Sequence, residues 1–271
     1  MQVFKTQPQI LKDYIQCFYT VQQSLNNTCD LHQRLPDGTL DIVFNLGGRV
    51  LISKDGISYT EMAPVALTGL YTGGRFIQYI GDVHLVGVVF KPGFGHLFVQ
   101  DSLAFYQDCL VDASVIFGQR APVLLEQLLD INDEAAKHQF LEVFLWQLLQ
   151  EKSRKSPDFR MAGAAQQILN THGTTGLETL QKSHYMSERN FRRKFVEMVG
   201  MSPKQYSIII RLKSFCKRYE LGGITYAELL TEFDYEDYSH LTKDFQKIAG
   251  TTPSDYFGKL NKVGAGFIHL I

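Results

Sequence analysis

The stretch Phe191-Arg-Arg-Lys-Phe195-Val-Glu-Met-Val-Gly200-Met-Ser202-Pro203-Lys-Gln-Tyr206 decides the fold of the C-terminal part of this chain. Its pattern returns fifty residues later as Leu241-x3-Phe245-x4-Gly250-x-Thr252-Pro253-x2-Tyr256. An offset shared by apolar, Gly, Pro and Tyr positions predicts a duplicated supersecondary unit, and two copies are too few for a solenoid.

Each copy predicts a helix, a turn, a second helix and then a helix that begins at a proline. Phe191 and Phe195 lie four residues apart, so they share one helical face, which we interpret as core. Gly200 suits the left-handed turn that ends a helix, and Ser202-Pro203 starts the next one.

The start of the second helix in each copy is marked by a capping residue. Ser187 and Asp237 stand fifty residues apart, and both side chains are of the type that caps a helix N-terminus. Short apolar segments precede them at Leu177 to Leu180 and at Ile224 to Leu230. We therefore predict two helix-turn-helix units, over roughly residues 177–206 and 224–256.

The two predicted units differ in charge. Residues 181–218 hold ten Lys and Arg against two Glu, a net charge of +8. Residues 224–256 hold seven acids against two Lys, a net charge of −5. A helix-turn-helix presents its second helix to the major groove, so a basic helix indicates phosphate contact. We expect the first unit to supply most of the affinity for DNA.

These motifs resemble the tandem helix-turn-helix domain of the AraC/XylS transcription regulators. The resemblance rests on residues 187–206, on Arg211-Leu212 and on residues 235–256, and it covers roughly residues 160–257. It implies two recognition helices that enter successive major-groove segments of double-stranded operator or promoter DNA. It also implies a bacterial, cytoplasmic activator with RNA polymerase as a further partner.

The resemblance assigns groove-facing positions in both recognition helices. Arg can bond guanine edges or phosphates, and Ser and Thr can bond either. A charge run is more often a solvated helix face, but the surrounding repeat favours DNA contact. The positions carried over are Arg189, Arg192, Arg193 and Lys194 in the first helix and Tyr238, Ser239, Thr242 and Lys243 in the second.

Length and charge indicate a second module. The chain has 271 residues, and residues 1–150 hold nine Lys and Arg against fifteen Asp and Glu, whereas residues 151–271 hold eighteen against thirteen. No apolar stretch approaches the length of a membrane span, so we expect no membrane partner. We predict an N-terminal domain at 1–152, a charged linker at 153–158 and a DNA-binding domain at 159–271.

The N-terminal half predicts strands first and helices afterwards. Short β-branched and aromatic runs occur at 41–46, 50–52, 76–80 and 84–90, separated by Gly and Asp turns. Apolar residues at helical spacing follow between Val123 and Gln150. The expected class is α+β, with a β-rich barrel-like or sandwich-like domain that ends in helices and precedes an all-α tandem helix-turn-helix domain.

The stretches Leu35 to Gly47 and Gly87 to Gly93 resemble a less characterised N-terminal domain found ahead of AraC-type DNA-binding domains. This resemblance implies a sensor or a dimerisation role. Four side chains are candidate anchors for a small-molecule effector in an apolar cavity, because Arg suits a carboxylate and Tyr adds a polar tip. They are Arg34, Tyr71, Arg75 and Tyr79.

Metal binding and catalysis find little support in the sequence. The N-terminal histidines are widely spread, and the four cysteines lack C-x-x-C spacing, so no cofactor or metal is expected and the thiols are interpreted as buried and free. Asp37 with Asp41, and Cys109 with Asp112, lack a partnered histidine, so no enzyme activity is expected. The hypothesis is an effector-modulated regulator; the alternative is a DNA-binding adaptor whose N-terminal half only forms a homodimer.

Overall fold

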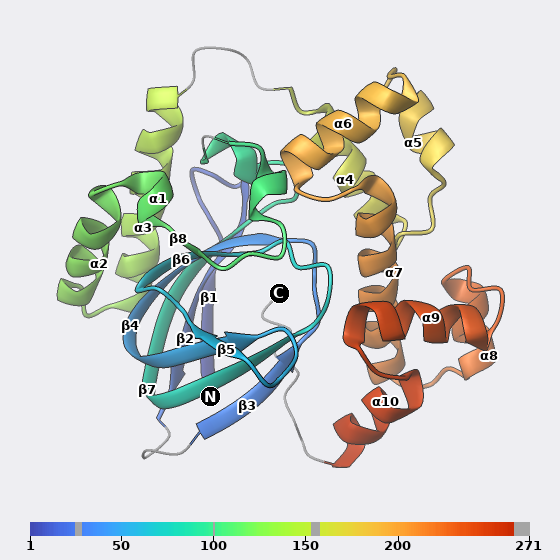
Figure 1. The fold of residues 1–271 in the computed structure, drawn as a ribbon. Helices are drawn as coiled ribbons and strands as arrows, with labels where there is room; N and C mark the ends of the chain where they lie inside the picture. The colour runs from blue at the N-terminus through green and yellow to red at the C-terminus, as the bar shows by residue number, and fades with distance from the viewer. Residues whose placement is uncertain (25–28, 100, 153–157, 263–271) are drawn as a thin grey trace.

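The computed structural model describes residues 1–24, 29–99, 101–152 and 158–262. A curled sheet with helices at its side is followed by a second group of helices that begins at Arg160 (Figure 1). The strands are β1 Gln2–Thr6, β2 Ile15–Gln23, β3 Cys29–Arg34, β4 Leu40–Ser53, β5 Tyr59–Glu61, β6 Val65–Gly69, β7 Arg75–Phe90 and β8 Val111–Asp112.

Two short 3-10 helices, η1 Gly95–Leu97 and η2 Leu103–Tyr106, precede the helices of the N-terminal domain. Those helices are α1 Ser114–Phe117, α2 Arg120–Asp130 and α3 Glu134–Lys152. The helices of the second domain are α4 Arg160–Asn170, α5 Leu177–Ser183, α6 Glu188–Val199, α7 Pro203–Glu220, α8 Tyr226–Glu232, α9 Tyr238–Ala249 and α10 Pro253–Lys262. The predicted α+β class, with a sheet followed by an all-α region, is confirmed. The predicted linker at 153–158 falls almost entirely outside the described residues.

The sheet is antiparallel and is centred on two long strands. Its order is β1-β2-β7-β4-β6-β8, with β3 also paired to β7 and β5 to β4, and this path of described strands does not close on itself. Alternate residues face opposite sides. Phe18, Ile42 and Val88 lie in the large core that helices cover, whereas Tyr19 and Val43 lie in a smaller cluster on the other face.

The prediction of four short strands separated by turns is wrong in one respect. β4 continues through the glycines at 47 and 48, and β7 continues through Gly81. The register between β4 and β7 shifts around Gly47, where Gly48 has a φ of 72°. These glycines are therefore bulge positions inside long bent strands, because a bulge needs the same conformational freedom as a turn.

Helices α2 and α3 cover the sheet as their apolar spacing predicts. Leu128 of α2 and Leu141 and Leu145 of α3 are buried, and α3 packs on β1, β2 and β7. The cysteine interpretation is only partly correct, since Cys17 and Cys216 are buried but Cys109 is exposed. Within the described residues, no helix combines the length and the apolar character needed to cross a membrane.

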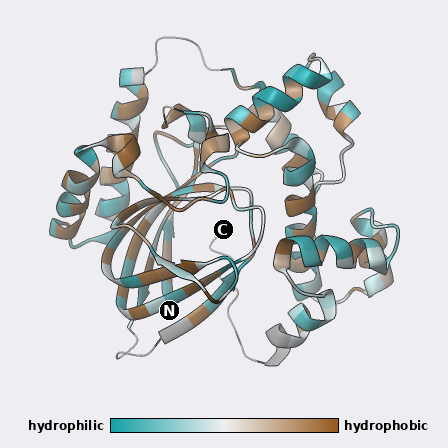
Figure 2. Cartoon of the chain, in the orientation of Figure 1, coloured by the Kyte–Doolittle hydropathy of each residue, from teal (hydrophilic) through white to brown (hydrophobic). Residues whose placement is uncertain are grey.

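The second domain contains the two predicted units, arranged around the connecting helix α7. α5 with α6 forms the first helix-turn-helix and α8 with α9 the second. Their turns use non-glycine residues in the left-handed region, Tyr185 at φ 54° and Asp234 at φ 55°. Hydrophilic residues predominate along α6, while the strands of the sheet are largely hydrophobic (Figure 2).

Candidate nucleic-acid interface

The first recognition helix, α6, is fixed by its ends and by its buried face. Ser187 occupies the predicted N-cap position, but its side chain makes no capping hydrogen bond there, whereas Gly200 ends the helix at φ 90° as predicted. Phe191, Phe195 and Val199 are buried on one side of the helix. Because residues three and four apart share a face, Arg192 and Arg193, which lie between these positions, are directed away from the core.

Three arginines occupy the outward face of α6. Arg189, Arg192 and Arg193 are exposed. The guanidinium of Arg192 pairs with Glu188 at 2.7 Å and that of Arg193 with Glu197 at 3.2 Å. Exposed pairs one helical turn apart contribute only about 0.3–0.5 kcal/mol, so DNA phosphates can replace these carboxylates at little cost.

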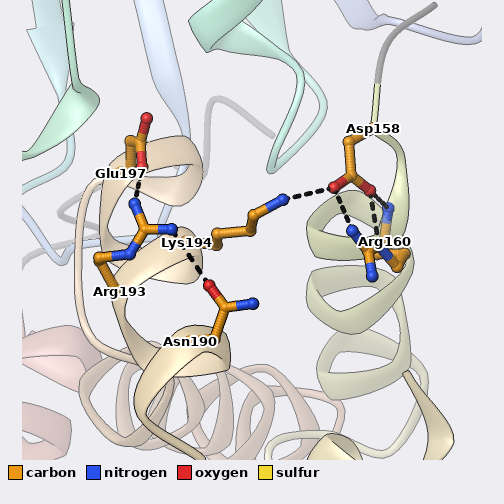
Figure 3. Close-up of polar contacts among 6 residues, drawn as sticks. All are labelled: Asp158, Arg160, Asn190, Arg193, Lys194 and Glu197. Carbon is orange, nitrogen blue, oxygen red and sulfur yellow. Dashed lines mark hydrogen bonds and ion pairs between the residues drawn. The ribbon is translucent and has the colours of Figure 1, made fainter. Parts of the chain in front are cut away.

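Lys194 points away from Arg193 and toward α4 (Figure 3). Its Nζ lies 2.8 Å from a carboxylate oxygen of Asp158, beside the start of α4 (Figure 3). Arg160 bonds both oxygens of the same carboxylate, at 2.9 Å and 2.7 Å. These cationic partners hold the pKa of Asp158 well below its usual range. DNA contact by Lys194 would therefore compete with an ion pair inside the domain.

The second recognition helix, α9, presents a less charged surface. Asp237 caps it by accepting a hydrogen bond from the backbone N–H of His240 at 2.7 Å, as its position in the sequence predicts. The candidate residues Tyr238, Ser239 and Lys243 are exposed, and Thr242 is half-buried. They lie at positions i, i+1, i+4 and i+5, so they share one face of the helix.

Most acids of the second unit have structural partners, which a count of charges does not reveal. Glu228 forms a capping box with Thr225, and Asp237 caps α9. Glu232 lies 3.7 Å from Arg218, and Asp244 lies 2.9 Å from Arg211. The negative charge of this unit is therefore largely placed at helix ends and against α7.

Of the four candidate effector residues, the structure brings Arg75 and Tyr71 into contact, while Arg34 and Tyr79 have other partners. Arg34 pairs with Asp37 at 2.9 Å and with Asp41 at 3.3 Å. The guanidinium of Arg75 lies 4.2 Å from the ring centroid of Tyr71. The remaining candidate, Tyr79, is buried and its ring packs on His32 at a centroid distance of 5.3 Å.

Arg34 and Arg75 both already have carboxylate partners. Arg75 bonds Asp108 at 2.7 Å, and it also donates to the carbonyl oxygens of residues 73 and 74. Burial raises the pKa of Asp41 to about 6, and the neighbouring carboxylate of Asp37 adds to this. The pairing partners Asp37, Asp41 and Asp108 were not recognised in the sequence. Asp37 lies only three residues from Arg34, but the fold is needed to bring Asp108 to Arg75.

A cleft of about 410 Å³ separates the sheet from the second helix-turn-helix. It is spanned by two hydrogen bonds to the last carbonyls of α9, from the backbone N–H of Gly74 to Ile248 at 2.6 Å and from Gln33 Nε2 to Ala249 at 3.1 Å. Of the four effector candidates, Arg75 lines the cleft. The lining residues are Gln33, Lys54, Asp55, Gly73, Gly74, Arg75 and Phe76 from one domain and Lys247, Ile248, Ala249, Gly250 and Thr251 from the other.

Two family profiles match the chain. Residues 180–259 match a profile described as a helix-turn-helix domain, which confirms that a domain of this kind lies in this part of the chain. Residues 6–112 match a domain of unknown function, DUF6597. Among curated proteins, none matches the chain.

Three solved structures are similar over most of their length. ToxT from Vibrio cholerae is 11% identical, with 89% of this chain and 98% of ToxT covered and a TM-score of 0.45. A second ToxT structure, with bound unsaturated fatty acid, is 11% identical over 87% of this chain and 96% of ToxT, at a TM-score of 0.43. The AraC-like transcriptional activator CuxR is 16% identical over 85% of this chain and 90% of CuxR, at a TM-score of 0.29.

Proposed function

We propose that this chain, a regulator of the AraC type with a tandem helix-turn-helix domain, binds specific operator sequences and is controlled through its N-terminal domain. The observation that carries the proposal is the pair of helices α6 and α9, each with one face in the core and the opposite face exposed. One recognition helix occupies each of two successive major-groove segments.

The chemistry of the two helices assigns them different parts in binding. Arg189, Arg192 and Arg193 on α6 supply charge for phosphates and planar donors for guanine edges. Ser239 and Thr242 on α9 supply neutral hydrogen-bonding groups, with one cation at Lys243. The first unit therefore provides most of the salt-dependent affinity, and the second adds discrimination between sequences.

A direct test measures the binding of the purified protein to a selected operator by fluorescence anisotropy at two salt concentrations. Arg192→Ala is expected to weaken binding and to reduce the dependence of log Kd on log salt by about one. Arg49→Ala is the matched control, because Arg49 is an exposed arginine of the N-terminal domain that pairs with Glu61 at 2.8 Å, much as Arg192 pairs with Glu188. An equal loss in the control would contradict groove contact by α6.

The effector is assigned to the cleft between the sheet and α9. Lys54 and Lys247 line it from the two domains, which favours an anionic small molecule. Such a ligand would touch the sheet and the end of a recognition helix at once. If no ligand from a screened set of small carboxylates shifts the melting temperature of the wild type, the adaptor alternative is favoured, in which the N-terminal domain only forms a homodimer.

A further inference from the structure

The connecting helix α7 holds the second recognition helix through one buried ion pair. Arg211 Nη2 lies 2.9 Å from Asp244 Oδ2, and the two side chains are only 13% and 11% exposed. Asp244 is on α9 but faces inward, opposite the residues assigned to the groove. Solvent and salt screen the attraction between two charges much less when the pair is buried than when it is exposed. The attraction therefore holds the geometry of this pair more firmly.

Arg211 reaches two further parts of the same unit. Its guanidinium lies 4.4 Å from the ring centroid of Tyr235, in the turn before α9. Its Nη2 also lies 3.5 Å from Nε2 of His240, in the first turn of α9. One side chain of α7 therefore contacts the turn of the second helix-turn-helix unit and both the beginning and the middle of α9.

The first unit has the same device with the charges reversed. Lys194 stands fifty residues before Asp244, at the same position of the repeat, and pairs with Asp158 beside α4 (Figure 3). In each unit the recognition helix is thus tied to the chain segment that precedes its own helix-turn-helix. Because the signs are opposite, neither recognition helix carries the charge that the other unit's partner requires.

We propose that Arg211 and Asp244 are positioning residues that fix α9 relative to α7, and so fix the spacing at which the two recognition helices meet DNA. The proposal rests on the proposed function in one respect, since it takes α6 and α9 as the two recognition helices. α7 follows α6 directly through Ser202 and Pro203, so the orientation of α9 on α7 determines its position relative to α6. A preorganised pair of helices loses less freedom on binding than a loosely joined pair.

The test compares two DNA duplexes, one with both operator elements and one with only the element read by α6. Asp244→Asn keeps the shape of the side chain and removes its charge. We call the ratio of the one-element Kd to the two-element Kd the two-element advantage. The expected result for Asp244→Asn is an unchanged Kd for the one-element duplex and a two-element advantage that is roughly tenfold smaller. The reciprocal variant Arg211→Asp with Asp244→Arg restores most of that advantage.

A matched control comes from the exposed pair that joins α7 to the same unit. Glu232→Gln removes the partner of Arg218, a pair between α7 and α8 at 3.7 Å with side chains 34% and 42% exposed. It is expected to change the two-element advantage by less than about twofold, since exposed pairs contribute little. Thermal unfolding of each variant establishes that it is folded.

Two outcomes overturn the inference. The first is an unchanged two-element advantage in folded Asp244→Asn, and the second is an equal loss on both duplexes, which would indicate a general loss of structure. Failure of the proposed function is separate, because wild-type protein would then show no sequence-specific binding to either duplex.

Discussion

Gly38 of the N-terminal domain lies against the ring of Tyr206 in α7. A Cβ at Gly38, where φ is 73°, would lie 2.9 Å from Cδ2 of Tyr206 and closer still to Cε2. Tyr206 is fully buried, so its ring has little room to move away. Glycine at this position therefore allows the two domains to dock closely.

Gly38→Ala should destabilise the protein more than Gly81→Ala. Gly81 has a similar φ of 77°, but a Cβ at that position would meet nothing within 4 Å, so it reports the cost of the left-handed backbone alone. The additional steric conflict at Gly38 is expected to cost about 1–3 kcal/mol more. Equilibrium urea unfolding measures the difference, and equal losses would show that the contact with Tyr206 is not restrictive.

Tyr185→Gly should stabilise the DNA-binding domain. Tyr185 is 93% exposed and holds φ at 54°, so its side chain contributes little packing to offset a strained backbone. Removing the strain raises the free energy of unfolding by about 1–2 kcal/mol. The greater freedom of glycine in the unfolded chain offsets roughly half of that increase. Tyr185→Ala keeps the strain and serves as the control. Equal unfolding free energies for the Ala and Gly variants would contradict this explanation.

Arg193→Ala should weaken operator binding more than Lys243→Ala. Both residues are exposed cations on recognition helices, but α6 carries three exposed arginines, whereas α9 carries one lysine on its groove face. The loss for Arg193→Ala is expected to be about tenfold in Kd. Titration of one labelled operator with each variant decides the matter, and an equal or larger loss for Lys243→Ala would reverse the assigned order of the two units.

The N-terminal domain should lose stability in mild acid because of His138. Burial lowers the pKa of His138 from the ordinary value of 6.5, and its ring lies between the hydroxyls of Thr6 at 2.9 Å and Thr20 at 3.0 Å. The unfolded chain binds the proton more readily, so stability is present above pH 6.5 and falls as the pH drops below it. Urea unfolding between about pH 7.5 and about pH 5 should show a shallower fall for His138→Gln. Parallel profiles for the two proteins would exclude His138 as the cause.

The helical domain could be predicted closely because its signals are local. Gly200 and Gly250 stop helices, Asp237 caps one, and the apolar spacing sets the buried faces, all within a few residues of the feature they determine. What the repeat concealed was the direction of individual side chains. Lys194 lies within a run of cations but is paired with Asp158, from a distant part of the chain.

The N-terminal domain was harder to predict because its features depend on distant partners. Gly48 and Gly81 resemble turn residues in the sequence, and only the pairing of β4 with β7 makes them positions inside long strands. Arg34 and Arg75 suited a ligand carboxylate, but Asp41 of β4 pairs with the first, and Asp108, in the segment between η2 and β8, pairs with the second. Their role as effector anchors stays a prediction. The cleft beside α9 requires both domains and left no local signal.

Selection of genomic DNA fragments by the purified full-length protein, read by sequencing at two salt concentrations, tests the central claim most directly. Two recognition helices in successive major grooves predict an enriched motif of two short elements about 10 base pairs apart, retained at the higher salt concentration. Binding that disappears at the higher salt concentration without any enriched motif would contradict the claim that α6 and α9 read sequence.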